Sequence, residues 1–188
     1  MTQINADVVG ISLLQRAGQW FAVAVMAFLT WRFALAPLDG SGLDSFLHMP
    51  DLIFHEAGHV LFLPFGRFMT VLGGSLFQVL VPLICAGTFL YQQNDRFAAA
   101  VCTWWAGQNL VDLAPYIADA RNLQLVLLGG RTGAEVEGHD WEYLLTSLGW
   151  LHLDHALGRA AQVAGTLVMV SALAWAIASI VRRRDELT

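Results

Sequence analysis

Two histidines and a glutamate stand close together in an apolar stretch, in the segment His55 to His59, which reads His-Glu-Ala-Gly-His. On a helix His55 and His59 lie one turn apart on the same face, so both imidazoles can bind one metal ion. Glu56 stands beside them, where its carboxylate could accept a proton from a metal-activated water. The flanking residues 52–63 are strongly apolar, so burying this cluster without a ligand would be costly.

The spacing His-Glu-x-x-His on a helix is typical of zinc metalloproteases. The alternative is chance, because a five-residue pattern also arises at random. Nitrogen and oxygen ligands with one open coordination position favour Zn²⁺ as the metal. Such a site needs a third ligand from elsewhere in the chain.

Two aspartates are predicted as metal ligands on a helix expected from Phe97 to about Ala120. A polar stripe follows one face of this helix, formed by Gln108, Asn109, Asp112, Tyr116 and Asp119. The expected depth in the membrane favours Asp112, because it lies about as far inside its helix as the histidines do. Asp119, followed by Arg121, also fits a helix end that reaches the interface.

Further candidates lie in the polar segment 121–158. His139 is the strongest of them, because Gly133 and Gly138 would let its loop fold inward. Its neighbour Asp140 could also reach the site, and it is expected to begin a helix with an acidic cap. The same segment contains His152, Asp154 and His155, which are more typical of a solvated loop or interface.

The composition predicts an integral membrane protein. Hydrophobic residues make up 56% of the chain and charged residues 13%, and the mean hydropathy is +0.55, whereas soluble proteins are about a quarter charged. The net charge of −5 argues against nucleic acid as a partner. A length of 188 residues predicts a single membrane-embedded domain, residues 1–188, with residues 121–158 as a polar extramembrane segment.

We expect an all-α fold with about four to five transmembrane helices, because a crossing needs about 20 apolar residues. The predicted crossings are residues 17–38, 75–91, 97–120 and 161–181. The motif helix, from about Pro50 to Leu63, is shorter and is expected to be half-buried or re-entrant. Residues 65–74 predict a re-entrant hairpin or extended edge, which is tolerated at membrane depth only where protein or water covers it.

The charges outside the helices predict the orientation. Three arginines, Arg182 to Arg184, follow the last apolar helix and predict a cytoplasmic C-terminus. The acidic loops at 37–51 and 119–158 then lie outside, which is consistent with a bacterial inner (plasma) membrane protein. The expected partners are the lipid bilayer and a membrane-protein or peptide substrate, and the oligomeric state stays open.

These motifs resemble those of the site-2 protease type of intramembrane zinc metalloprotease. The resemblance implies that His55, His59 and a downstream aspartate hold zinc and that Glu56 activates water. The family's downstream motif contains Asn and Pro and ends in Asp-Gly. Here it runs from Asn109 through Asp112 and Pro115 to Asp119, followed by alanine. The resemblance covers residues 50–120.

The leading hypothesis is therefore a membrane-embedded zinc-dependent endopeptidase in which Glu56 is catalytic. One alternative is a membrane zinc hydrolase that acts on a lipid ester or amide with the same nucleophile. A second alternative is a non-catalytic membrane protein that binds a metal or haem through the paired histidines. Glu56 would have no evident role in that second alternative.

Overall fold

The computed structural model describes residues 2–40, 46–135 and 138–185. Its helices are α1 (Thr2–Ala34), α2 (His48–Phe62), α3 (Arg67–Tyr91), α4 (Arg96–Ala118), α5 (Asp140–Leu148) and α6 (Asp154–Asp185), with short 3₁₀ helices at Leu63–Phe65 and Leu151–Leu153. The predicted all-α fold is confirmed for these residues. The predicted loops at 37–51 and 119–158 lie partly outside the described residues, at 41–45 and 136–137.

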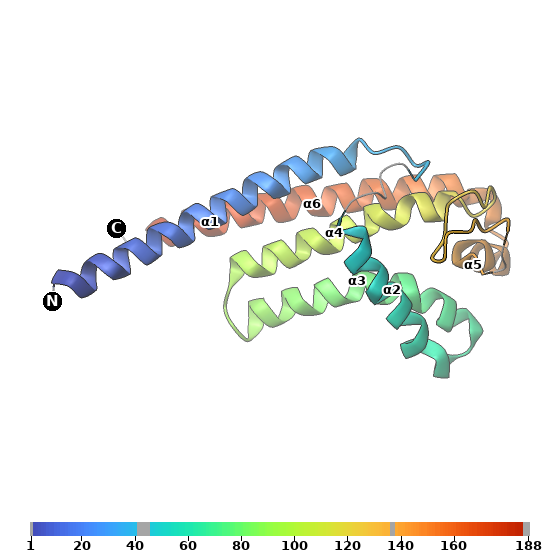
Figure 1. The fold of residues 1–188 in the computed structure, drawn as a ribbon, viewed down its shortest axis with the longest axis horizontal. Helices are drawn as coiled ribbons and strands as arrows, with labels where there is room; N and C mark the ends of the chain where they lie inside the picture. The colour runs from blue at the N-terminus through green and yellow to red at the C-terminus, as the bar shows by residue number, and fades with distance from the viewer. Residues whose placement is uncertain (1, 41–45, 136–137, 186–188) are drawn as a thin grey trace.

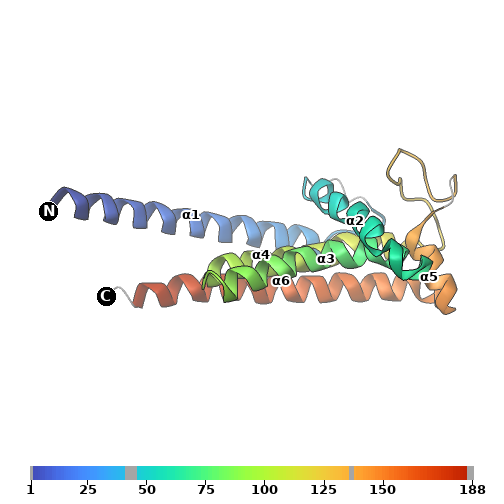
Figure 2. The same cartoon turned by 90° about the horizontal axis from the view of Figure 1, so that it is seen from below.

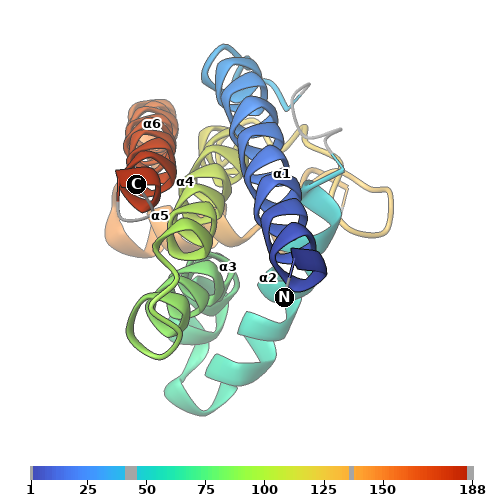
Figure 3. The same ribbon diagram turned by 90° about the vertical axis from the view of Figure 1, so that its left-hand side faces the viewer.

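Four long helices, α1, α3, α4 and α6, lie side by side along the long axis of the molecule (Figures 1 and 3). The beginning of α1 and the end of α6 lie at the same end of this bundle (Figure 2). The short helices α2 and α5 lie toward the opposite end, together with the loop that precedes α5. The motif helix is therefore packed at one end of the bundle.

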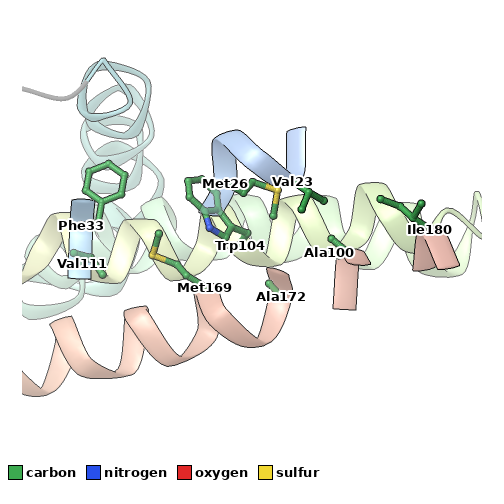
Figure 4. Close-up of a cluster of buried hydrophobic side chains, with 10 residues drawn as sticks. Val23, Met26, Phe33, Ala100, Trp104, Val111, Met169, Ala172 and Ile180 are labelled. Carbon is green, nitrogen blue, oxygen red and sulfur yellow. The ribbon is translucent and has the colours of Figure 1, made fainter. Parts of the chain in front are cut away.

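Helix α4 packs between α1 and α6 and supplies much of the core (Figure 4). Close approach to α6 depends on small residues, because a Cβ added to Gly107 would lie 2.8 Å from the Gly165 carbonyl oxygen. On the side of α1, the Trp104 indole donates a 2.8 Å hydrogen bond to the Thr30 hydroxyl. The core cluster of buried side chains comprises Val23, Met26, Phe33, Ala100, Trp104, Val111, Met169, Ala172, Ala176 and Ile180.

Two described segments are long and apolar enough to cross a membrane, by length and composition. They are Arg67–Tyr91, which is α3, and Leu151–Arg182, which contains most of α6, and an 18-residue stretch within each has a mean hydropathy of 1.9 and 2.0, respectively. These two segments are consistent with a membrane protein. The expected total of four to five crossings stays a prediction.

The predicted hairpin over residues 65–74 is wrong. The chain turns at Gly66, whose φ of +87° suits glycine, and α3 begins at Arg67. The adjacent glycines Gly73 and Gly74, the last two residues of the predicted hairpin, lie inside α3. A Cβ on Gly73 would lie 2.8 Å from the Gly58 carbonyl oxygen of α2. These glycines therefore serve close helix packing, which local sequence does not reveal.

Helix α2 presents one face to α3 and α4. His48, Leu52, His55 and His59 recur at the spacing of a single helix face, and all four line one cavity. Gly58 points instead at α3, where an added Cβ would meet the Gly73 carbonyl oxygen. The glycine within the His-Glu-Ala-Gly-His segment thus brings α2 against α3.

Candidate metal centre

Two histidines and an aspartate converge at the end of the bundle. The Nε2 atom of His55 lies 2.9 Å from Oδ2 of Asp140, and Nε2 of His59 lies 3.2 Å from the same oxygen. One ligand atom from each of the three residues lies within 4.8 Å of the other two, and among the described residues this group could hold a metal ion. His55 is buried and His59 and Asp140 are largely covered. The arrangement provides two nitrogens and one carboxylate oxygen facing a common point.

The other ring nitrogen of each histidine faces an oxygen that can only accept a hydrogen bond. Nδ1 of His55 lies 2.9 Å from Oε1 of Gln78, and Nδ1 of His59 lies 2.9 Å from the Thr70 carbonyl oxygen. Each Nδ1 therefore carries a proton, which leaves the Nε2 lone pairs available to a metal. Because both Nε2 atoms also face the Asp140 carboxylate, a cation or a proton must stand between them.

Gly74 on α3 makes room for this convergence. A Cβ at position 74 would lie 2.6 Å from Nε2 of both His55 and His59. Real Cβ atoms do not approach other atoms so closely, so any larger side chain would displace the imidazoles. The backbone of α3 therefore forms one wall of the candidate centre.

A cavity of about 450 Å³ opens onto the three residues. The exposed Glu56 lines it beside them, so its carboxylate can reach a water or a reacting group held there. The cavity also has an apolar wall, formed by Leu52, Leu113, Leu125, Val126, Leu127 and Leu128. The cavity is therefore lined by polar side chains at the candidate centre and by apolar side chains elsewhere.

Asp140 is the first residue of α5, as expected for a helix beginning there. The cap is His139 rather than an acidic residue, because Nδ1 of His139 accepts a hydrogen bond from the Glu142 N–H at 3.2 Å. The backbone N–H of Asp140 donates to the Tyr116 hydroxyl at 3.0 Å. On the other side, the Trp141 indole donates to the Ser75 hydroxyl at 3.2 Å. These contacts hold the start of α5 against α3 and α4.

The charges around α5 favour an ionised Asp140. Burial would raise the pKa of the Asp140 carboxyl, but the adjacent imidazoles of His55 and His59 outweigh it when a proton lies on Nε2 and hold that pKa below the ordinary value. Burial lowers the pKa of His139 despite the opposing effect of Asp119. A neutral His139 fits its role as the acceptor that caps α5.

Asp112 and Asp119, the predicted third ligands, lie outside the convergent group. Asp112 contacts Nδ1 of His48 at 3.0 Å and accepts a hydrogen bond from Nε2 of Gln78 at 3.2 Å. Asp119 accepts hydrogen bonds from the backbone N–H groups of Gln124 and Leu125, at 3.0 and 2.9 Å. The structure places Asp140 at the position for which the sequence favoured one of these two residues.

The remaining candidates, in the segment 121–158, lie outside the group that could hold a metal. His139 faces Asp119, with 3.5 Å between Nε2 and Oδ2. Asp154 is buried and pairs with Arg121 at 2.7 Å. His152 and His155 are exposed and are absent from the group that could hold a metal.

Sequence reasoning named Asp140 as within reach but did not choose it, and it missed the roles of Gln78, Thr70 and Gly74. Asp140 directly follows Gly138 and His139, so the inward-folding loop was the available signal. Gln78 was a polar residue in an otherwise apolar span, which is a reason to look for a buried partner. Nothing in the local sequence marks the Thr70 carbonyl.

No protein-family model, no curated protein and no solved structure matches this chain.

Proposed function

We propose that this protein is a membrane-embedded zinc-dependent endopeptidase. The observation that carries the proposal is the convergence of His55, His59 and Asp140 at 2.9–3.2 Å beside Glu56, at the edge of an open cavity. Metal-assisted hydrolysis requires ligands such as two histidines and one carboxylate, together with a second carboxylate that binds no metal, here that of Glu56.

The donor set supports zinc as the metal. Zinc in hydrolytic sites binds three protein nitrogen or oxygen ligands and leaves a position open. His55, His59 and Asp140 would supply these ligands, and each histidine has an acceptor at Nδ1 that fixes its orientation. Bound zinc would polarise a substrate carbonyl and lower the pKa of a water molecule.

Glu56 is the proposed catalytic base. Its carboxylate would accept a proton from the attacking water and transfer it to the leaving amine. Glu56 is exposed within the cavity rather than engaged in packing, so it can move between these two positions. The apolar wall at Leu125 to Leu128 would exclude water and accept apolar side chains that flank the cleaved bond.

The membrane setting is proposed from the surface of the long helices. Large apolar side chains are exposed on them, such as Phe21 (72%), Ile84 (61%) and Leu167 (62%), and such surfaces are typical of contact with lipid or protein. We propose that α1, α3, α4 and α6 cross the plasma membrane. The 15-residue α2 is only about 22 Å long and would enter without crossing the roughly 30 Å of hydrocarbon.

The test compares metal content and peptide hydrolysis in detergent-purified protein. We expect about one zinc per chain in the wild type, and we expect its loss in His59→Ala and Asp140→Ala. Glu56→Gln should keep the zinc and lose hydrolysis of unfolded β-casein by at least about 100-fold, because it removes the base alone. Glu142→Gln, the same change outside this cavity, serves as the matched control.

A fluorogenic phospholipid, assayed in parallel, separates the peptidase from the lipid hydrolase. Glu56-dependent hydrolysis of the phospholipid without cleavage of casein would transfer the proposal to lipids. Wild-type protein without metal, or Glu56→Gln with full activity, would contradict the hydrolase altogether.

A further inference from the structure

A chain of hydrogen bonds leads from α4 through α3 to one of the two candidate metal-binding histidines. The Asp112 carboxylate accepts from Nε2 of Gln78 at 3.2 Å, and Oε1 of the same amide faces Nδ1 of His55 at 2.9 Å. Asp112 also contacts Nδ1 of His48 through both of its oxygens, at 3.0 and 3.1 Å. Through Gln78, these hydrogen bonds connect Asp112 to His55, although Asp112 is not one of the three residues that could hold the metal.

Hydrogen-bond polarity gives this chain a direction. An ionised carboxylate can only accept, so the amide of Gln78 must turn its NH₂ group toward Asp112. That turn leaves Oε1 facing His55, and a carbonyl oxygen can only accept from Nδ1–H. The Nε2 lone pair of His55 is then the one left for a metal.

Burial makes this orientation costly to reverse. Gln78 is 2% exposed and the Asp112 side chain 6% exposed. A reversed amide would point NH₂ at Nδ1–H and a carbonyl oxygen at a carboxylate, and each of these mismatches would cost free energy. His59 needs no such arrangement, because its acceptor is the Thr70 backbone carbonyl, which cannot rotate.

We infer that Asp112 is a positioning residue that fixes the proton and orientation of His55 through Gln78, and that it is not a metal ligand. The inference rests on the proposed zinc centre and assigns a role to an aspartate that the centre itself leaves unused. It also explains why Asp112 of α4 and Gln78 of α3 lie beside α2, the motif helix.

The test measures the zinc dissociation constant, Kd, in four purified variants. Asp112→Asn removes the fixed polarity, because an asparagine can either donate to Gln78 or accept from it; its Kd should rise about tenfold. Asp112→Ala should raise the Kd by up to about 100-fold. Adding Gln78→Glu to Asp112→Asn should bring the Kd back to within about threefold of wild type, because a carboxylate at 78 can only accept from His55.

The fourth variant, Asp51→Asn, is the control. Asp51 is a fully buried aspartate of α2 that accepts from the Trp105 indole at 2.8 Å. Its hydrogen bond goes to Trp105 rather than to Gln78, so replacing it should lower stability while the zinc Kd stays within about threefold. A general loss of structure would raise the Kd in this control as well.

Three results would overturn the inference. Asp112→Ala could abolish zinc binding as completely as Asp140→Ala, which would make Asp112 a ligand. It could leave the Kd unchanged, or Gln78→Glu could fail to restore it.

A second measurement needs no metal. If Asp112 acts on His55 through Gln78, the Tm losses of Asp112→Ala and Gln78→Ala in metal-free protein should be non-additive. Additive losses would contradict the inference. Failure of zinc binding or of Glu56-dependent cleavage in the wild type would instead count against the proposed function.

Discussion

The candidate centre depends on residues that hold no metal themselves. Gly74 is the clearest example, because a Cβ there would lie 2.6 Å from both Nε2 atoms. Gly74→Ala should abolish zinc binding while the helical content stays near wild type, since the clash falls on the proposed ligands His55 and His59. Equilibrium dialysis with zinc and circular dichroism measure the two effects.

Gly87→Ala is the matched control for this prediction. Gly87 lies on the same helix, and an added Cβ would meet nothing within 4 Å. In a helix interior, alanine is favoured over glycine by roughly 0.5–1 kcal/mol, so this variant should bind zinc normally and be slightly more stable. Zinc binding by Gly74→Ala equal to that of Gly87→Ala would mean that the α3 wall is not as close as described.

At the scale of single residues, the sequence predicts the motif well and the third member of the group poorly. His55 and His59 share a helix face whatever the rest of the chain does, so spacing alone brings them together. Asp140 reaches them only through a loop of irregular structure and the docking of α5, neither of which has a periodic pattern. Asp112 and Asp119 lay on a visible polar stripe, but their partners are an amide, a histidine and backbone N–H groups.

Among the elements, the described parts of the segment from Asp119 to His139 contribute both to the wall of the cavity and to the start of α5. Its start is held by the Asp119 carboxylate, which accepts from two backbone N–H groups, and its end by His139 facing the same carboxylate. Between them, Leu127 and Arg131 close a tight turn with a 2.7 Å backbone hydrogen bond. This loop carries the apolar wall and delivers Asp140.

Asp119→Asn should loosen this loop, because an asparagine NH₂ group in place of one oxygen would face a backbone N–H. We expect faster cleavage after the exposed Arg131 by trypsin in detergent, and weaker zinc binding because Asp140 loses its fixed position. Asp95→Asn is the control, since Asp95 caps α4 at the other end of the bundle. Equal cleavage rates in the two variants would show that Asp119 does not anchor the loop.

The long helices were largely predictable, because apolar runs of about 20 residues are typical of helices, although α1 begins well before residue 17 and α6 before residue 161. The error at residues 65–74 has a specific cause. Glycine pairs break isolated helices, but Gly73 and Gly74 are stabilised inside α3 by the contact with α2. Such a contact is tertiary, and a window of local sequence contains no information about it.

On the scale of the whole molecule, the termini and the candidate centre lie toward opposite ends of the bundle. The start of α1 and the end of α6 lie at the same end of the bundle, and the helices of the candidate centre, α2 and α5, lie toward the opposite end (Figure 2). If the four long helices cross the membrane, both termini lie on one side of it and the loop after α4 lies on the other. The arginines Arg182 to Arg184 predict that the side of the termini is the cytoplasm. The apolar composition predicts a membrane protein, whereas the pairing of the helices is visible only in the structure.

Cysteine labelling in intact cells tests this arrangement. In a background of Cys85→Ser and Cys102→Ser, Val126→Cys should react with a membrane-impermeable maleimide, because Val126 is 68% exposed in the loop. Gln93→Cys, in the turn between α3 and α4, should react only after the cells are permeabilised. Labelling of both cysteines, or of neither, in intact cells would contradict four crossings.

The close contact between α2 and α3 also changes how relatives of this chain should be sought. His-Glu-x-x-His alone is a short pattern that occurs by chance. Here its fourth residue, Gly58, faces Gly73, and its last residue, His59, faces Gly74, so the motif and the glycine pair form a single unit across two helices. A genome search for His-Glu-x-Gly-His, a later Gly-Gly pair with a glutamine one turn on, and a distant His-Asp would select chains able to build this centre. It would reject chains that have the histidines but a larger residue at the position of Gly74.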